Sequence, residues 1–368
     1  MKILLLVPRH QGSQSKQIDP QTSLPLYQAQ NFWYKALRSL GHDVKVIVYT
    51  GTNSAIDYYS SYGDYILKRL KLPRTLFQKT LQLLFDSTHK KQKEIKETSQ
   101  NFQPHLVIIS GNTDLVFPET LAEIKKVTRC KLVLLNGLSP SVFATKAERE
   151  FVYDLDYVFT NDRYHALDWL MLGARRAKSL PVSAIDPSFH KKYRLSPKEK
   201  GRYSSDVCFV GSLYPDLLYK DRRNLLESLT SFNLKIWSPN EKEILENPKL
   251  KKFYQGHAEG IKMLKIFSAS KICLNFHGDT MLSGGNMRTF EICGARGFQI
   301  LDRTDPSWFE ADKELVTFHS KPDLYKKVSY YLSHERERRE IALAGYKRTQ
   351  KDHTYQKRFE KLIKLVFK

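Results

Sequence analysis

Short apolar runs alternate with segments of helical spacing along most of the chain. Runs of this length without polar interruptions are typical of parallel strands that are buried on both faces. Their alternation with helices predicts repeated βαβ units, and therefore an α/β protein with parallel sheets. The predicted strands are 2–7, 44–49, 105–110, 131–135, 157–160, 205–210, 234–237, 271–276 and 298–301, and the predicted helices include 26–40, 165–172, 222–229 and 259–268.

A stretch rich in Pro, Lys and Ser, residues 186–200, interrupts this alternation and predicts a linker. With 368 residues the chain is long enough for two ordinary α/β domains. We therefore expect an N-terminal Rossmann-like domain over 1–185 and a second domain over 201–351.

Composition adds a strong basic surplus. The chain has 60 Lys and Arg against 39 Asp and Glu, a net charge of +21 that favours anionic partners. Nucleic acid is not expected, because the aromatic residues fall in strands and on helix faces and are not interleaved with basic residues. Four isolated cysteines without a C-x-x-C pair predict reduced core residues. The N-terminus reads as a first strand, and no apolar stretch has the length of a membrane span, so we expect a cytoplasmic protein.

The segment 65–96 departs from the α/β rhythm, since it is strongly basic and its apolar residues follow helical spacing. A basic amphipathic helix of this kind can lie on an anionic membrane surface, which would place the protein at the inner face of the membrane. The same pattern fits a helix that packs on the first sheet and exposes its charged side. Both interpretations stay open.

The strand 271–276 leads into a loop of small residues and then into a helix. Bare backbone before a helix can cradle a phosphate, an arginine in the first turn adds a cation, and a glutamate one turn later can bind ribose hydroxyls. An ordinary α/β unit with an internal Arg–Glu ion pair fits the same residues. The candidate donor-binding residues here are Gly284, Gly285, Asn286, Arg288 and Glu291.

A second phosphate site is predicted at the start of the second domain. Gly211 and Ser212 follow its first strand, and the next helix begins with basic residues that include Arg223. No G-x-x-x-x-G-K-[ST] motif is present, which argues against a P-loop NTPase.

One known pattern matches the second half of the chain. RTFEICGARGFQILD, the Glu-Leu-Val-x-Phe strand, Tyr330-Tyr331-Leu332, Ala344-Gly345-Tyr346 and His353-Thr354-Tyr355-x-x-Arg358 together resemble the spore-maturation (CgeB-like) glycosyltransferases. The resemblance extends from about Asp154 to the C-terminus. It implies the GT-B fold, which has two facing Rossmann-like domains with parallel sheets, and a C-terminal helix, 352–368, that packs back on the first domain.

The resemblance also implies an activity. The protein would transfer a sugar, as a hexosyltransferase, from a nucleoside-diphosphate sugar to a hydroxyl of a glycan, lipid-linked or protein acceptor, without a cofactor or bound metal. Gly211, Ser212 and Arg223 would face the diphosphate, and His257 would contact the base. Ser283 stands eight residues before Glu291, where retaining enzymes often carry a glutamate, so the stereochemical outcome is open. A non-catalytic nucleotide-binding or scaffold protein of the same fold is the alternative.

Transfer to a hydroxyl calls for a base on the first domain. His10 and Asp114 each follow a predicted strand at its carboxyl end, and we predict Asp114 first and His10 second as that catalytic base. A solvated loop histidine and an aspartate that begins a turn are the simpler interpretations. Asn136 stands where the family tends to carry an acidic residue.

Overall fold

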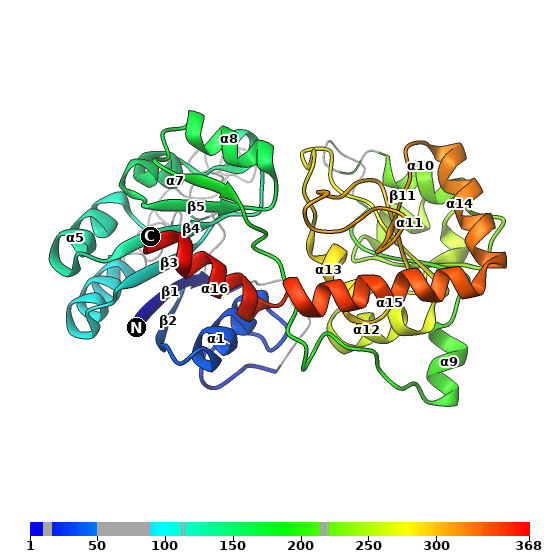
Figure 1. Ribbon diagram of the computed structural model, residues 1–368, viewed down its shortest axis with the longest axis horizontal. Coiled ribbons are helices and arrows are strands. Elements are labelled where there is room, and N and C mark those ends of the chain that lie inside the picture. Colours follow the sequence, from blue (N-terminus) through cyan, green and yellow to red (C-terminus); the bar gives the residue numbers. More distant parts are fainter. Residues whose placement is uncertain (10–16, 50–88, 112, 114, 214–218, 220) are drawn as a thin grey trace, which may run out of the picture. The chain divides into compact units, whose positions relative to one another are not determined.

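A computed structural model describes residues 1–9, 17–49, 89–111, 113, 115–213, 219 and 221–368 (Figure 1). Both predicted catalytic residues, His10 and Asp114, lie outside these ranges. Of the basic segment 65–96, only residues 89–96 are described, and they belong to a helix over 89–102. Internal contacts group the chain into two compact units. The first comprises 1–160, 165–180 and 362–368, and the second comprises 161–164 and 181–361, so the predicted linker 186–200 falls within the second unit.

The first unit contains a six-stranded sheet in which every pair of neighbouring strands is parallel. The strands lie in the order β2-β1-β3-β4-β5-β6, so the direction in which the chain adds strands reverses between β1 and β3. The strands are β1 (Lys2–Pro8), β2 (Asp43–Tyr49), β3 (Leu106–Ser110), β4 (Lys131–Leu135), β5 (Tyr157–Thr160) and β6 (Ala177–Ser179).

Helices cover the two faces of this first sheet, because its central strands are apolar on both sides. Successive residues of β1, such as Ile3 and Leu4, are fully buried although they point to opposite faces. Helix α1 (Ala29–Ser39) buries Phe32 and Trp33. Among the described residues, this half also contains the helix over 89–102, α5 (Pro118–Thr128), α6 (Pro140–Phe143), α7 (Lys146–Phe151) and α8 (Arg163–Met171), with a 3-10 turn at Val152–Asp154.

The second unit contains a five-stranded parallel sheet in the order β11-β10-β9-β7-β8. Here the direction of strand addition reverses between β7 and β9. The strands are β7 (Val207–Val210), β8 (Leu234–Trp237), β9 (Ile272–Asn275), β10 (Gln299–Leu301) and β11 (Val316–Thr317). The two-residue β11 and the three-residue β10 are shorter than the apolar pattern suggests.

Helices cover the two faces of the second sheet (Figure 1). Two separate apolar clusters pack them against it. One contains residues of α10 (Arg222–Glu227) and α14 (Lys321–Ser333). The other contains residues of α12 (Gly260–Ala269) and α13 (Met287–Gly294). The remaining described helices of this half are α9 (Pro197–Tyr203), α11 (Glu241–Leu245) and α15 (Glu335–Asp352), with a 3-10 turn at Lys251–Phe253. Helix α16 (Tyr355–Val366) belongs to this unit up to residue 361 and to the first unit from residue 362.

The four cysteines are buried and free of disulfides, as the sequence predicts. Within the described ranges, none of the helices has both the length and the apolar character that are needed to cross a membrane.

Candidate functional site

The carboxyl ends of β7 and β9 form the switch point of the second sheet. In open α/β sheets a crevice forms where strand order reverses, because the connections on the two sides leave in opposite directions, and ligands bind there. Gly211 and Ser212 follow β7, while Phe276 and His277 follow β9. The strand order therefore predicts a binding site beside these four residues.

Arg222, the first residue of α10, lies across this switch point. Its Nη1 donates to the carbonyl of Ser212 at 2.8 Å, and its Nη2 donates to the carbonyl of Phe276. The side chain is buried, its guanidinium rests 3.8 Å from the ring centroid of Tyr219, and burial lowers its pKa to about 10. Its Nε has no hydrogen-bond partner among the described residues. The two carbonyls do not neutralise the positive charge of this buried guanidinium, and one of its N–H groups stays unpaired, which favours an anionic ligand at this point.

Arg288, on α13, reaches the same strand end from the opposite face of the sheet. Its Nε donates to the carbonyl of Val210, the last residue of β7, at 3.3 Å. Its guanidinium also pairs with the carboxylate of Glu291, one turn along the helix. The charge of Arg288 contributes to lowering the pKa of Arg222, so the two cations act on one another. Two arginines therefore converge on the switch point, one from each face.

Glu291 is 4% exposed and is held between two partners. Its Oε2 pairs with Arg288, and its Oε1 lies 3.7 Å from Nε2 of His190. Burial acts to raise the pKa of this carboxyl, but Arg288 and His190 outweigh it and hold the pKa at about 2. The carboxylate therefore stays ionised and fixes the orientation of Arg288. Its predicted contact with ribose stays a prediction.

This shifted carboxyl predicts a pH dependence of stability. A glutamate whose pKa falls from 4.5 to about 2 on folding contributes stability that is fully present above pH 4.5 and is lost as the pH falls through about 2. We expect the free energy of unfolding of the wild type to fall over this window by about 3 kcal/mol more than that of Glu291→Gln. Urea unfolding at a series of pH values measures the difference. Glu246→Gln, at an exposed glutamate, is the control, and identical curves for all three proteins would contradict the assignment.

The loop before α13 already holds an anion that belongs to the chain. The backbone N–H groups of Leu282, Ser283 and Gly284 donate to one carboxylate oxygen of Asp162, at 2.7, 2.7 and 2.9 Å. The hydroxyl of Ser283 donates to the other oxygen at 3.1 Å. The idea that this backbone cradles a phosphate therefore needs correction at Ser283 and Gly284, because their N–H groups are satisfied by Asp162.

Gly284 is required at its position by the close approach of this loop to another backbone segment. A Cβ there would lie 1.7 Å from the carbonyl oxygen of Asn161. Gly284→Ala should therefore destabilise the protein by about 1 to 3 kcal/mol, the usual cost of overpacking. Gly201→Ala, inside α9 and with no atom within 4 Å of the added methyl, should be neutral or stabilising. Thermal unfolding compares the two variants. Equal changes in melting temperature would show that the loop moves to accept the methyl group without cost.

The remaining loop residues have structural contacts. Asn286 is the N-cap of α13: its side chain accepts from the N–H of Thr289, and its amide donates to Asn275 at 2.9 Å. A Cβ on Gly285 would lie 2.9 Å from the hydroxyl of Thr289. These contacts fix the start of α13, and thereby the position of Arg288.

The other predicted donor residues have different surroundings. Gly211 and Ser212 lie at the switch point, as their place after β7 predicts. Arg223 is half-buried beside Arg222, and it is Arg222 that reaches the strand ends. His257 is half-buried, its Nδ1 has no hydrogen-bond partner among the described residues, and burial, with a contribution from Arg288, lowers its pKa.

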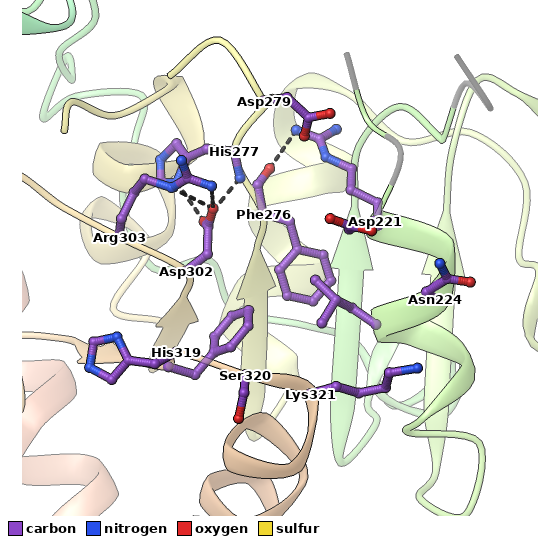
Figure 2. A pocket seen from close by; sticks show the side chains of 13 residues that line it. Asp221, Asn224, Phe276, His277, Asp279, Asp302, Arg303, His319, Ser320 and Lys321 are labelled. Carbon is purple, nitrogen blue, oxygen red and sulfur yellow. Dashed lines mark hydrogen bonds and ion pairs between the residues drawn. The ribbon is translucent and has the colours of Figure 1, made fainter. Parts of the chain in front are cut away.

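A cavity of about 510 Å³ opens at the carboxyl edge of the second sheet (Figure 2). None of the nine predicted donor residues lines it, but Arg222 does. Asp302 lies between His277 and Arg303 in its wall: its Oδ1 is 2.7 Å from Nδ1 of His277, and its Oδ2 accepts from Nε of Arg303 at 2.8 Å. His277 and Arg303 outweigh burial and hold the pKa of Asp302 well below its usual range.

Arg222, His277, Asp302 and Arg303 were not predicted from the sequence. All four lie at or directly after the carboxyl ends of strands or at the start of the helix after β7. The rule that selected Gly211 and Ser212 would have found them if it had been applied to every strand end of the second sheet. No group of three or more His, Cys, Asp or Glu side chains in the described ranges is arranged to hold a metal ion.

The first sheet has a polar edge at its own switch point. The Tyr49 hydroxyl donates to the carbonyl of Ser110 at 3.1 Å, and Gln30 donates to the hydroxyl of Ser110 at 3.0 Å. Gln28 donates to the carbonyl of Pro8 at 2.7 Å. These bonds join the ends of β1, β2 and β3. Along the chain, His10 follows β1 and Asp114 follows β3.

Asn136, which follows β4, is buried and bonds to Glu148 at 3.2 Å. A Cβ on Gly111 would lie 2.5 Å from its side chain, so this glycine makes room for the asparagine. The contacts give Asn136 a structural role at the edge of the sheet.

Comparison with known proteins gives consistent matches. A family model described as glycosyl transferase-like matches residues 222–364. The spore protein CgeB of Bacillus subtilis (strain 168) is 23% identical over 239 residues, which cover 59% of this chain and 73% of CgeB.

Solved structures extend the similarity over both units. Anabaena HepE in complex with UDP-glucose aligns with 100% of this chain and 99% of its own, at 12% identity and a TM-score of 0.61. A glycosyltransferase from Rickettsia africae aligns with 99% of this chain and 97% of its own, at 13% identity and a TM-score of 0.64. Sucrose-phosphate synthase from Thermosynechococcus elongatus covers 100% and 99%, at 11% identity and a TM-score of 0.61. At these identities the similarity shows the fold, and it confirms the predicted pair of parallel-sheet domains.

Proposed function

We infer that this chain, a CgeB-like glycosyltransferase with the GT-B fold, transfers a sugar from a nucleoside-diphosphate sugar to a hydroxyl-bearing acceptor. The observation that carries the donor assignment is the pair of arginines at the switch point of the second sheet. HepE, which has the same fold, is solved with UDP-glucose, and this supports the assignment. We propose a hexose as the transferred sugar.

The chemical task of the donor site is electrostatic. Negative charge builds on the diphosphate as the bond to the sugar breaks, and preorganised cations lower the free energy of that transition state. Arg222 and Arg288 are held in place before any ligand binds, by strand-end carbonyls and by Glu291. Because this charge is supplied by side chains, we propose that transfer needs no bound metal ion.

The acceptor base remains a proposal on the first unit. Asp114 and His10 follow strands that pair with each other, and parallel strands bring their carboxyl ends to one edge. Replacing Asp114 with Asn should lower turnover while donor affinity, set in the second unit, stays unchanged. Wild-type turnover in Asp114→Asn would mean that His10 or the donor phosphate is the catalytic base.

The acceptor class and cellular site are also proposals. A glycan or lipid-linked acceptor suits a protein with the basic segment 65–96, through which the enzyme would associate peripherally with an anionic membrane surface from the cytoplasm. Binding to anionic but not neutral vesicles, lost on charge reversal of Lys68, Arg69, Lys71 and Arg74, would support this role.

A non-catalytic nucleotide-binding or scaffold protein of the same fold is the second candidate. A thermal-shift screen across uridine, guanosine, thymidine and adenosine diphosphates identifies the base. Release of nucleoside diphosphate from the matching sugar donors, with and without an acceptor panel, then separates the two candidates. Binding without any hydrolysis or transfer would favour the scaffold.

A further inference from the structure

A second cavity, of about 840 Å³, lies at the opposite edge of the second sheet from the arginine pair. Ser268 and Ala269, at the end of α12, line it, and so does Arg296, which follows α13. Because each helix ends where the next parallel strand begins, these residues place the cavity at the amino edge of the sheet. It is therefore separate from the donor site.

Charge distinguishes this cavity from the one at the carboxyl edge. Five cationic side chains line it and no carboxylate does, whereas Asp221, Asp279 and Asp302 line the other cavity. None of the five forms an ion pair with a carboxylate of the described residues. The five are Lys191, Lys192, Arg194, Lys200 and Arg296.

Attraction to helix ends explains only part of this cluster. Arg296 stands two residues after the end of α13, where a cation complements the negative end of the helix dipole. Lys191, Lys192 and Arg194 belong to the irregular segment before α9 and are exposed. Like charges gathered around one hollow repel each other and destabilise the fold, so an anion that neutralises them would stabilise it.

Aromatic contacts hold parts of the cluster in place before a ligand arrives. The Arg296 guanidinium lies 4.3 Å from the ring centroid of Tyr346, and the Lys191 ammonium lies 6.0 Å from that of Tyr193. Tyr193 is itself fixed, since its N–H donates to the hydroxyl of Ser268 at 3.2 Å and its own hydroxyl donates to the carbonyl of Phe189 at 3.0 Å. Cations that are positioned in advance lose less entropy on binding.

We propose that this cavity binds an anionic phosphate group, presented either by a soluble phosphate ester or by an anionic lipid headgroup. Ammonium and guanidinium groups from separate segments supply the charge and hydrogen-bond donors that phosphate oxygens accept. The site would be additional to the diphosphate site at the carboxyl edge, and binding there would not require Arg288.

The test uses the full chain and two probes: inorganic pyrophosphate in calorimetry, and sedimentation with vesicles of phosphatidylglycerol or of phosphatidylcholine. The test variant is Lys192→Glu/Arg194→Glu. Its matched control is Lys198→Glu/Lys252→Glu, which changes the net charge equally at exposed lysines outside the lining. Each pair is also made with Arg288→Ala, which weakens the donor site. Should charge reversal unfold the protein, Lys192→Ala/Arg194→Ala replaces it.

If the ligand is a soluble phosphate ester, the test variant should bind pyrophosphate at least tenfold more weakly than the wild type. The control should bind it as the wild type does. The same difference should appear when both pairs also carry Arg288→Ala. Selective loss of sedimentation with phosphatidylglycerol vesicles, at unchanged pyrophosphate affinity, would assign the site to a lipid headgroup. Equal behaviour of the test and control variants with both probes would overturn the proposal.

Discussion

Replacing Arg288 with alanine should lower the turnover of sugar transfer by about a hundredfold to a thousandfold, or about 3 to 4 kcal/mol of transition-state stabilisation. The side chain is fixed at the end of β7 by Val210 and Glu291, so its charge acts without reorganisation during the reaction. Arg288→Lys keeps the charge but loses the two-sided anchorage, and it should recover only part of the rate.

Single-turnover kinetics at saturating donor measures this effect separately from binding. Arg336→Ala removes the same charge from a side chain that is 94% exposed, and it should leave turnover unchanged. Arg222→Ala tests the second cation in the same assay. Wild-type turnover in Arg288→Ala, with the fold intact, would exclude a role for this arginine in stabilising the leaving diphosphate.

Asp162→Ala should produce the largest loss of stability, about 4 kcal/mol or more. Three backbone N–H groups share one oxygen of this buried carboxylate, and each buried donor left without an acceptor costs about 1 to 3 kcal/mol. Asp162→Asn retains one oxygen acceptor but adds an amide donor near the same N–H groups, so it should fall between alanine and the wild type.

Urea unfolding gives the free energies. The control is Asp168→Ala. Asp168 is half-buried, and the hydroxyl of Ser141 donates to its carboxylate at 3.0 Å. Loss of that hydrogen bond should lower the free energy of unfolding by about 1 kcal/mol or less. Equal losses at the two positions would mean that water replaces the Asp162 carboxylate in the loop. Loss of donor binding in Asp162→Asn would additionally show that the loop positions Arg288.

The two predictions depend on different ranges of contact along the chain. Arg288 and Glu291 are one helical turn apart, so their pairing follows from sequence spacing alone. Asp162 stands 120 residues before Leu282, and no local pattern connects them. The glycines and serine of the loop predicted a phosphate, whereas the folded chain bonds the N–H groups of Ser283 and Gly284 to Asp162.

The orientation of α10 about its axis was likewise not predictable from local sequence. The start of α10 is basic, and the sequence favoured Arg223. Successive helical residues point about 100° apart, so only one of two adjacent arginines can face the strand ends. Packing of Leu226 against the sheet turns Arg222 inward.

The sequence by itself determined the α/β class and the approximate place of the strands, because a strand buried on both faces needs an unbroken apolar run and such runs are visible without a structure. The ends of β7 and β9 were located for the same reason. The tertiary structure decided the strand order, and with it the switch point between Arg222 and Arg288. Only the tertiary structure places His190 beside Glu291 and five cationic side chains around one cavity. Such contacts depend on how distant segments of the chain pack, and they leave no periodic signal in the sequence.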